Sequence, residues 1–366
     1  MPPLSILIKP VSGACNCRCR YCFYDDVSRK RENASLGTMS LITLENVVQK
    51  SMSKATHECT LVFQGGEPTL AGLDFYENLV SLVNKHNTKR LKINYALQTN
   101  GIVIDRQWAR FFAENKFLVG LSLDGTKDVH DNCRIDSQLN GTFTQVMRTA
   151  KIFESCKTEY NILVTVTSAV AKNIGKIYGF FKRNNFVYQQ YIPCLDPLGE
   201  APGARDYSLT PEIYGQFLCA LFDLWYNDII RGKNISIRFF DNLLLMLKGR
   251  PPECCGMSGK CMYQTVIEAD GGVYPCDFYV LDEFCHGNLN TDDFESIDAR
   301  RRDSGFVEES IKLAEQCRTR RCQWIPICRG GCRRNYEGAS GNYFCESFKM
   351  FFDYTYERLN RLAAML

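Results

Sequence analysis

The stretch LSILIKPVSGACNCRCRYCFY, residues 4–24, joins a strand candidate to a cluster of cysteines and decides the fold. Its apolar start, LSILIK, predicts a buried strand. The cysteines that follow are Cys15, Cys17, Cys19 and Cys22. Three of them have the spacing C-x3-C-x2-C, and three thiolates on a tight loop can hold three irons of a [4Fe–4S] cube and leave the fourth open. A zinc knuckle with Cys17 as the fourth ligand is the alternative, although neighbouring ligands in CNCRC would strain a tetrahedral site and no histidine lies nearby.

Strand candidates and helical patterns alternate along residues 4–193. The strand candidates are LSILIK (4–9), TLVFQ (60–64), LKINYALQ (91–98), FLVGLSLD (117–124), YNILVTVT (160–167) and FVYQQYIP (186–193). Helical patterns between them include LITLENVVQKSMSKA (41–55), DFYENLVSLVNKH (74–86) and RQWARFFAEN (106–115). This alternation indicates βαβ units with parallel strands, in either an incomplete barrel or a doubly wound sheet.

Polar and glycine-rich stretches come directly after three of these strands. QGGEP, QTNG and LDG each stand at the carboxyl end of a strand, and the cysteine cluster follows the first strand. A parallel α/β barrel builds its active site at this end of its strands. The sequence therefore predicts an α/β fold, with a partial (β/α)6 TIM-like barrel over residues 1–193. Connecting loop and helices (194–250), a cysteine-rich module (251–345) and a C-terminal helix (346–366) are expected to complete the chain.

The composition narrows the functional class. The 366 residues carry 44 basic and 41 acidic side chains, so the net charge is only +3, which argues against a nucleic-acid or membrane-surface binder. No run approaches the roughly 20 apolar residues of a membrane span. The N-terminal residues lack the basic and apolar regions of a signal peptide, which predicts a cytoplasmic protein. Nineteen cysteines in a reducing compartment then indicate metal ligation rather than disulfides.

Cys15, Cys19 and Cys22 after the first strand, with GGEP (65–68) after the second, resemble the radical S-adenosylmethionine superfamily. In that superfamily the three cysteines bind the cluster, and the open iron takes the amino and carboxyl groups of S-adenosylmethionine. The resemblance leaves Cys17 as a bystander. It also implies a set of S-adenosylmethionine contacts, namely Tyr21, Gly66, Ser122, Arg134 and Leu195. Ser122 and Arg134 offer a hydroxyl and a guanidinium, which suit ribose and carboxylate.

The later cysteines resemble the SPASM module of radical S-adenosylmethionine enzymes that modify peptides and proteins. The full module holds two further [4Fe–4S] clusters, so the resemblance implies three clusters in all. The nearer auxiliary cluster would use Cys255, Cys261, Cys276 and Cys332, and the farther one Cys317, Cys322, Cys328 and Cys345. Two features are ambiguous: Cys254 stands beside Cys255, and C-x4-C replaces the usual C-x2-C between Cys317 and Cys322. A structural zinc ribbon is the alternative.

The whole chain resembles one family, the anaerobic sulfatase-maturating enzymes, through LVFQGGEPTLAGL, LQTNG, FLVGLSLDG, CLDPL, FDLWY and YPCDFYVLD. These enzymes oxidise a cysteine or serine in an unfolded sulfatase segment, C/S-x-P-x-R, to Cα-formylglycine. The resemblance makes Asp277, after the ligand Cys276, the general base, and suggests substrate contacts at Tyr24, Gln64 and Gln98. Expected partners are the sulfatase polypeptide and an electron donor such as flavodoxin or ferredoxin, and we expect a monomer.

Two other interpretations remain open from the sequence. A SPASM peptide maturase that forms thioether or carbon–carbon links in a ribosomal peptide would share the clusters but would not need Asp277. A zinc-bearing binding or scaffold protein would have no ligand for GGEP to meet. Without the resemblance, an aspartate beside a cysteine ligand is as often a turn residue that holds its loop.

Overall fold

A computed structural model describes residues 4–319 and 321–365, so the ends of the expected modules at 1–3 and 366 lie outside the described residues. The chain divides into two compact units. The first consists of Met1–Ser122, Arg134–Tyr160 and Tyr263–Gly305, and the second of Leu123–Cys133, Asn161–Met262 and Phe306–Leu366. These units group residues by contact. They cut across the ranges 1–193, 194–250, 251–345 and 346–366, which stay a prediction of the modules along the chain.

The first unit is built on a sheet with the strand order β4-β3-β2-β1-β8-β9. Its strands are β1 (Leu4–Ile8), β2 (Glu58–Phe63), β3 (Lys92–Thr99), β4 (Phe117–Ser122), β8 (Thr265–Ile267) and β9 (Val273–Tyr274). Strands β1 to β4 pair in parallel, β8 is parallel to β1, and β9 is antiparallel to β8. The apolar residues that predict the strands form the core, since Ile6, Ile8, Leu61 and Phe63 have no exposed surface.

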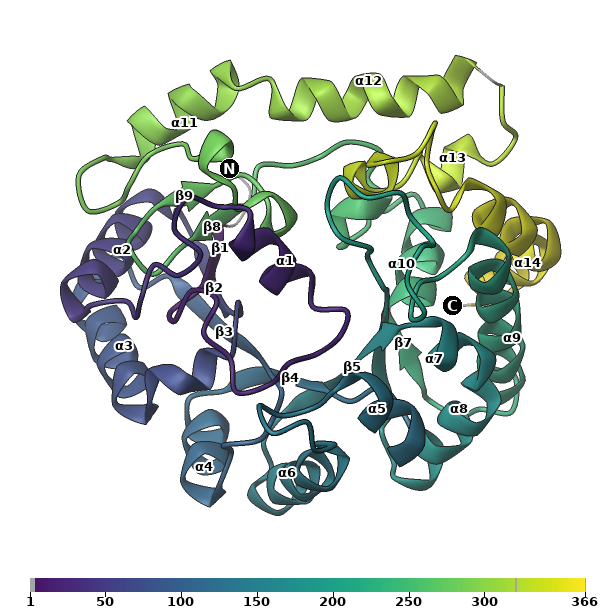
Figure 1. The fold of residues 1–366 in the computed structure, drawn as a ribbon, viewed down its shortest axis with the longest axis horizontal. Coiled ribbons are helices and arrows are strands. Elements are labelled where there is room, and N and C mark those ends of the chain that lie inside the picture. Colours follow the sequence, from purple (N-terminus) through teal and green to yellow (C-terminus); the bar gives the residue numbers. More distant parts are fainter. Residues whose placement is uncertain (1–3, 320, 366) are drawn as a thin grey trace. The chain divides into compact units, whose positions relative to one another are not determined.

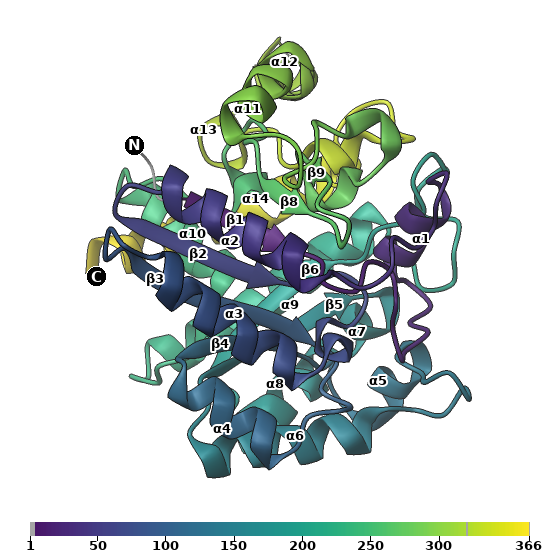
Figure 2. The same cartoon turned by 90° about the vertical axis from the view of Figure 1, so that its left-hand side faces the viewer.

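Helices and short turns connect these strands. They are α1 (Phe23–Arg29), α2 (Leu41–Lys54), η1 (Pro68–Ala71), α3 (Leu73–His86), α4 (Arg106–Glu114), α6 (Phe143–Cys156), η3 (Asp277–Tyr279), η4 (Asp282–Phe284) and α11 (Phe294–Asp303). Helices α2 and α3 lie side by side along the strands (Figures 1 and 2). Side-chain caps start two of the helices: Ser40 accepts a hydrogen bond from the Thr43 amide at α2, and Asp105 caps α4.

The second unit contains strands β5 (Tyr160–Val166), β6 (Tyr188–Pro193) and β7 (Ser236–Ile237), which pair in parallel in the order β5-β6-β7. Its helices and turns are α5 (Lys127–Cys133), α7 (Ser168–Lys172), α8 (Ile174–Arg183), α9 (Pro211–Ile229), α10 (Arg238–Leu247), η2 (Cys255–Met257), α12 (Phe306–Thr319), α13 (Ile325–Cys328), η5 (Arg333–Tyr336) and α14 (Cys345–Met365). Helices α9 and α14 pack side by side (Figure 1). An aromatic cluster that includes Trp225, Phe240 and Phe351 fills the space between α9, α10 and α14.

The six strands and the helices expected between residues 4 and 193 are confirmed. Strands β8 and β9 are missing from the expectation because they are only three and two residues long, too short for a periodic signal. The available signal is the turn sequence ADGG between TVI and VY, which is typical of a hairpin. This hairpin matters for the site, because β8 pairs with β1 and brings residues after Tyr263 beside the start of the chain.

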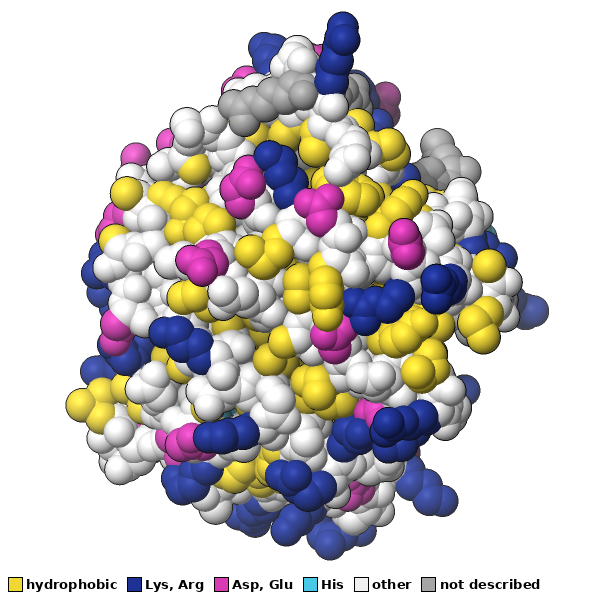
Figure 3. Space-filling view, turned by 90° about the vertical axis from the view of Figure 1, so that its right-hand side faces the viewer, with side chains coloured by type: hydrophobic (Ala, Val, Ile, Leu, Met, Phe, Trp, Pro, Cys, Tyr) yellow, Lys and Arg dark blue, Asp and Glu magenta, His cyan; other side chains and the backbone are white. Residues whose placement is uncertain are grey.

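The surface reflects the near balance of charges. On the face drawn in Figure 3, Lys and Arg side chains are interspersed with Asp, Glu and hydrophobic side chains. Among the described residues, no helix is long and apolar enough to cross a membrane.

Candidate active site

The first cysteine loop lies between the end of β1 and the start of α1. Cys22 is the N-cap of α1, and its Sγ accepts a hydrogen bond from the Asp25 amide at 3.4 Å. Side chains from other segments reach the remaining thiols: Asn100 Nδ2 lies 3.9 Å from Cys15 Sγ, and Arg134 Nη1 lies 4.0 Å from Cys19 Sγ. Donors of this kind stabilise negative charge on sulfur, so the loop suits thiolates.

The three predicted ligands of this loop fit an iron–sulfur cluster. Burial, together with the nearby thiolates of Cys19 and Cys15, raises the pKa of Cys22 to about 12. Thiolates this close together repel one another, and a metal core removes that repulsion and keeps the thiols deprotonated. Three thiols on one short loop are the donor set that a [4Fe–4S] cube with one open iron needs.

Cys17 differs from its neighbours. Its side chain is largely buried, and its amide donates to Cys15 Sγ at 3.3 Å. Hydrogen bonding to Cys15 and Cys19 raises the pKa of Cys17, and the same hydrogen bond lowers the pKa of Cys15. That Cys17 is a bystander rather than a ligand stays a prediction.

The GGEP loop after β2 packs against the cysteine loop. The amides of Gly66 and Glu67 donate to the carbonyl oxygens of Ser12 and Ala14 at 2.9 and 2.8 Å. A Cβ at Gly66 would lie only 2.0 Å from the Ala14 oxygen, so the close approach of the two loops requires glycine.

Glu67 fixes the neighbouring loops rather than facing solvent. Its buried carboxylate accepts hydrogen bonds from the Thr69 and Thr99 hydroxyls and the Asn100 amide, at 2.6, 2.8 and 2.7 Å. Burial raises the pKa of Glu67 in spite of these donors. The sequence does not predict this role of Glu67 and Asn100, because their contacts depend on the parallel pairing of β2 with β3.

Asp277 is the best-defined acid of the candidate site. It begins the turn η3, directly after Cys276, and is only 9% exposed. Lys9 Nζ forms an ion pair with its Oδ1 at 2.5 Å, and Gln64 Nε2 donates to its Oδ2. Two residues predicted for separate roles, Asp277 and Gln64, are therefore in direct contact. Lys9 is missing from the prediction, although a lysine at the carboxyl end of an apolar strand is a visible signal.

The other residues predicted to contact S-adenosylmethionine or substrate lie on separate elements. Tyr21 is buried, and the Arg134 guanidinium lies 5.4 Å from the centre of its ring. Ser122 ends β4, and Gln98 lies within β3, one residue before its end. Tyr24 is 2% exposed, and its hydroxyl is hydrogen-bonded to Glu268. In the second unit, Leu195 follows β6, and Arg334 donates to the neighbouring Asp196 carbonyl oxygen at 2.6 Å.

The farther auxiliary set surrounds a cavity in the second unit. The cavity, of about 280 Å³, is lined by Cys317, Cys322, Cys328 and Cys345 together with Trp324, Phe348 and neighbouring residues. Cys322 thus lines the same cavity as the other three thiols in spite of the two extra residues of C-x4-C, and Arg321 before it adopts a left-handed backbone conformation. Among residues 4–319 and 321–365 no three His, Cys, Asp or Glu side chains gather tightly enough to hold a single metal ion. Four thiols spread around a cavity fit a polynuclear cluster with one cysteine per iron.

The nearer auxiliary set has three members in the second unit and one in the first. Burial raises the pKa of Cys332 to about 12, and the neighbouring thiolates of Cys255, Cys261 and Cys254 add to that effect. Cys254 is exposed whereas Cys255 is half-buried, which favours Cys255 as the ligand. Cys276, the fourth member, belongs to the first unit and follows β9.

The parallel strands with a cysteine loop after β1, and the later cysteine sets, define a radical S-adenosylmethionine enzyme with a SPASM domain. The family model of the radical SAM superfamily matches residues 10–167, and that of SPASM, an iron–sulfur cluster-binding domain, matches residues 255–332. The expected α/β fold of the radical S-adenosylmethionine type is thereby confirmed, and the cofactors are S-adenosylmethionine and iron–sulfur clusters.

The chain belongs to the family of anaerobic sulfatase-maturating enzymes. It is 46% identical over 371 residues to a cysteine-type anaerobic sulfatase-maturating enzyme of Clostridium novyi (strain NT), covering 100% of this chain and 99% of the relative. It is 29% identical over 374 residues to a serine-type enzyme of Bacteroides thetaiotaomicron, covering 96% and 89%. The solved structure of native anSMEcpe with bound AdoMet and Cp18Cys peptide has a TM-score of 0.93 and 46% identity, covering 99% of both chains. The zinc-protein interpretation is thereby set aside.

Proposed function

We propose that this protein oxidises the cysteine of a C-x-P-x-R segment in an unfolded sulfatase to Cα-formylglycine. Family membership supports the reaction. The identity of 46% to a cysteine-type enzyme, against 29% to a serine-type enzyme, supports cysteine as the preferred residue. The relative crystallised with a Cp18Cys peptide supports a peptide of this kind as the substrate. Membership in this family also favours sulfatase maturation over thioether or carbon–carbon bond formation.

The observation that carries the proposal is the geometry of Asp277. Conversion of a cysteine to the aldehyde oxidation level removes one hydrogen atom from Cβ, one proton from the thiol and one electron, and an auxiliary iron–sulfur cluster would accept that electron. A carboxylate that is nearly buried, held on both oxygens and placed beside a cluster ligand is the group that can take the proton. The thioaldehyde that results exchanges its sulfur for the oxygen of water and releases hydrogen sulfide.

The cofactors would be held by the residues described above. Cys15, Cys19 and Cys22 would ligate the first cluster, which with bound S-adenosylmethionine supplies the 5′-deoxyadenosyl radical that removes the Cβ hydrogen. The S-adenosylmethionine contacts in this proposal are Tyr21, Gly66, Ser122, Arg134 and Leu195. Tyr24, Gln64 and Gln98 remain the proposed substrate contacts.

The auxiliary sets would hold two more [4Fe–4S] clusters, one at Cys255, Cys261, Cys276 and Cys332 and the other at Cys317, Cys322, Cys328 and Cys345. The cavity surrounded by the second set supports that assignment. A full chain would then contain about twelve iron atoms. The proposal further includes a cytoplasmic monomer that takes electrons from a flavodoxin or ferredoxin.

Mass spectrometry of a C-x-P-x-R peptide tests the proposed function. The peptide is incubated anaerobically with cluster-loaded enzyme, a reductant and S-adenosylmethionine, beside the matching S-x-P-x-R peptide. We expect the cysteine peptide to lose sulfur and gain an aldehyde oxygen faster than the serine peptide loses hydrogen. Formation of 5′-deoxyadenosine with both peptides unchanged would contradict the proposal and favour peptide cross-linking chemistry.

A further inference from the structure

Lys9 is a buried lysine whose position is fixed by its backbone and its stem. It follows β1 directly, and its amide donates to the Ile267 carbonyl oxygen of β8 at 2.8 Å. A Cβ at Gly65 would lie 3.1 Å from both Cβ and Cγ of Lys9, so the lysine stem packs against that glycine. The whole side chain has no exposed surface. An ammonium group held away from water needs an oppositely charged partner within the protein, because desolvation of an unpaired charge costs free energy.

That partner is the proposed base. Lys9 Nζ lies 2.5 Å from Asp277 Oδ1, while Gln64 holds Oδ2 from the end of β2. Rotation of the carboxylate about its Cβ–Cγ bond would break both contacts at once. The two strand ends β1 and β2 therefore fix the direction in which the carboxylate points.

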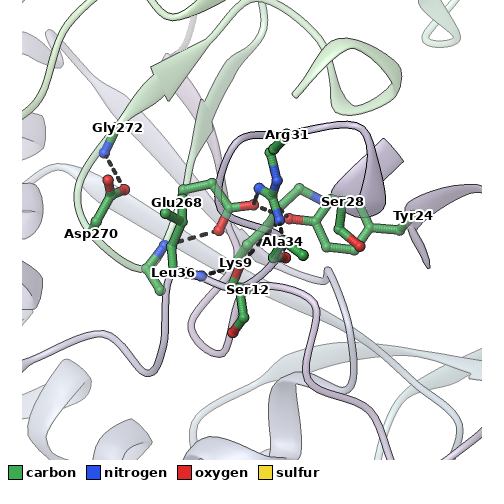
Figure 4. Close-up of polar contacts among 12 residues, drawn as sticks. Lys9, Ser12, Tyr24, Ser28, Arg31, Ala34, Leu36, Glu268, Asp270 and Gly272 are labelled. Atoms are coloured by element: carbon green, nitrogen blue, oxygen red, sulfur yellow. Dashed lines mark hydrogen bonds and ion pairs between the residues drawn. The ribbon is translucent and has the colours of Figure 1, made fainter. Parts of the chain in front are cut away.

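The aromatic ring of Tyr24 holds the ammonium from another side. Lys9 Nζ lies 3.7 Å from the centre of this ring, within the range of a cation–π contact. The Tyr24 hydroxyl is bonded to Glu268, whose carboxylate also pairs with Arg31 Nη1 at 2.8 Å. Figure 4 shows Lys9, Tyr24, Arg31 and Glu268 converging from the β1 end, α1, the loop after α1 and the hairpin that follows β8.

Arg31 closes this network on the backbone. Its Nη2 donates to the Ser12 hydroxyl at 3.3 Å and to the Ala34 carbonyl oxygen at 2.9 Å. The two cations, Lys9 and Arg31, are thus paired with two carboxyl groups, Asp277 and Glu268, and burial raises the pKa of Glu268 to about 7. Buried groups that are paired in this way hold one geometry, because no member can move without leaving a buried polar group unpaired.

We propose that Lys9 is a positioning residue for the reaction, which orients the Asp277 carboxylate toward the substrate thiol, and that Tyr24, Glu268 and Arg31 hold Lys9 in place. The inference rests on the proposed function, in which Asp277 accepts the thiol proton. Lys9 itself touches neither the thiol nor the reacting carbon in this assignment. Its effect is therefore on the step that needs the carboxylate, and not on cleavage of S-adenosylmethionine.

The test compares Lys9→Met with wild type and with Lys182→Met. Methionine keeps the length of the stem and removes the charge. Lys182 pairs with buried Asp228 in the second unit and serves as the matched control. For each cluster-loaded enzyme, iron content, the KM and kcat for the C-x-P-x-R peptide, and the ratio of 5′-deoxyadenosine to formylglycine are measured. We expect Lys9→Met to lower kcat for product about 10- to 100-fold, as misplacement of a catalytic group by an ångström does.

The ratio separates positioning from a structural defect. Loss of fold or of cluster lowers 5′-deoxyadenosine and product together, whereas misorientation of Asp277 raises the ratio while KM and iron content stay at the wild-type values. Lys182→Met is expected to keep the wild-type ratio. A wild-type ratio in Lys9→Met that retains its iron would overturn the inference.

The double variant Lys9→Met/Asp277→Asn keeps the inference testable if the single variant does not fold, since it leaves no buried charge unpaired. If Lys9 acts only through Asp277, the double variant has the same ratio and the same residual product rate as Asp277→Asn alone. A further loss of product in the double variant would overturn the positioning role. If Asp277→Asn itself makes product at the wild-type ratio, the base assignment in the proposed function fails. If Asp277→Asn raises the ratio and Lys9→Met does not, only the inference about Lys9 fails.

Discussion

Two buried aspartates, one in each compact unit, are paired with lysines but differ in their place in the fold and in the exposure of those lysines. Asp228 lies within α9, and Lys182, Lys233 and Tyr178 donate to it at 2.6, 3.2 and 3.0 Å. Both of these lysines reach solvent, with side chains 32% and 50% exposed. Asp277 lies in a turn directly after Cys276, a proposed cluster ligand, and its lysine is completely buried.

The difference separates a structural ion pair from the one that we propose to be reactive. Asp228 sits on a rigid helix with donors on both oxygens and cations that water can still solvate. Asp277 lies where strand ends, a glycine-rich loop and a cysteine loop converge. The cation that pairs with it is fully buried, and desolvation of that cation costs free energy. Burial of a paired carboxylate is therefore no sign of function by itself, and the proposal for Asp277 rests on the residues that surround it.

The largest expected effect is the loss of S-adenosylmethionine cleavage, and it gives the background value against which variants of the two aspartates are compared. Cys19→Ala removes one of three proposed ligands of the first cluster, so 5′-deoxyadenosine should fall to background and iron from about twelve to about eight atoms per chain. Chromatography of 5′-deoxyadenosine and an iron assay check this. Wild-type cleavage of S-adenosylmethionine in Cys19→Ala would contradict the ligand assignment and remove the source of the radical from this loop.

A smaller effect is expected on the structural side of the comparison. Asp228→Asn keeps the shape of the side chain but weakens three charged hydrogen bonds, so the free energy of unfolding should fall by about 1–3 kcal/mol. Urea unfolding measures this change, provided that the dependence of the unfolding free energy on urea concentration is the same in both proteins. The ratio of 5′-deoxyadenosine to formylglycine should stay at the wild-type value. A raised ratio in Asp228→Asn would break the distinction between the two aspartates.

The smallest effect is a pH dependence carried by Asp228. Burial raises its pKa, but hydrogen bonds from Lys182, Tyr178 and Lys233 outweigh burial and lower it overall. A carboxyl with a lowered folded-state pKa contributes stability above its unfolded pKa of about 3.9, and this contribution is lost as pH falls through the folded-state pKa. The stability difference between wild type and Asp228→Asn should therefore shrink on acidification below about pH 4. A difference that grows on acidification would contradict this sign.

The sequence predicts most of the fold and part of the site, for a physical reason in each case. Apolar runs such as YNILVTVT determine the long buried strands, and the cysteine spacings identify the cofactor class without any tertiary information. The role of Asp277 comes from the family resemblance, since an aspartate beside a cysteine is locally an ordinary turn residue. The contacts of Lys9 could not be predicted, because β8 must first pair with β1 to bring Asp277 near it.

Glu268 and Arg31 illustrate the same limit. Arg31 stands in a polar stretch and Glu268 follows only the short strand TVI, so periodicity does not distinguish either from a solvated surface residue. Their side chains are nevertheless 0% and 1% exposed, because they neutralise each other across segments far apart in the chain. Charges that pair over long sequence separations are invisible to periodicity, whereas the strands that carry them are not.

The measurement that tests the account most directly is the ratio of 5′-deoxyadenosine to formylglycine in Asp277→Asn, beside Asp228→Asn and wild type. The account predicts that Asp277→Asn still cleaves S-adenosylmethionine while product formation falls about 10²- to 10⁴-fold, the range for loss of a general base. Asp228→Asn should match wild type in both quantities. Normal formylglycine formation by Asp277→Asn would contradict the central claim.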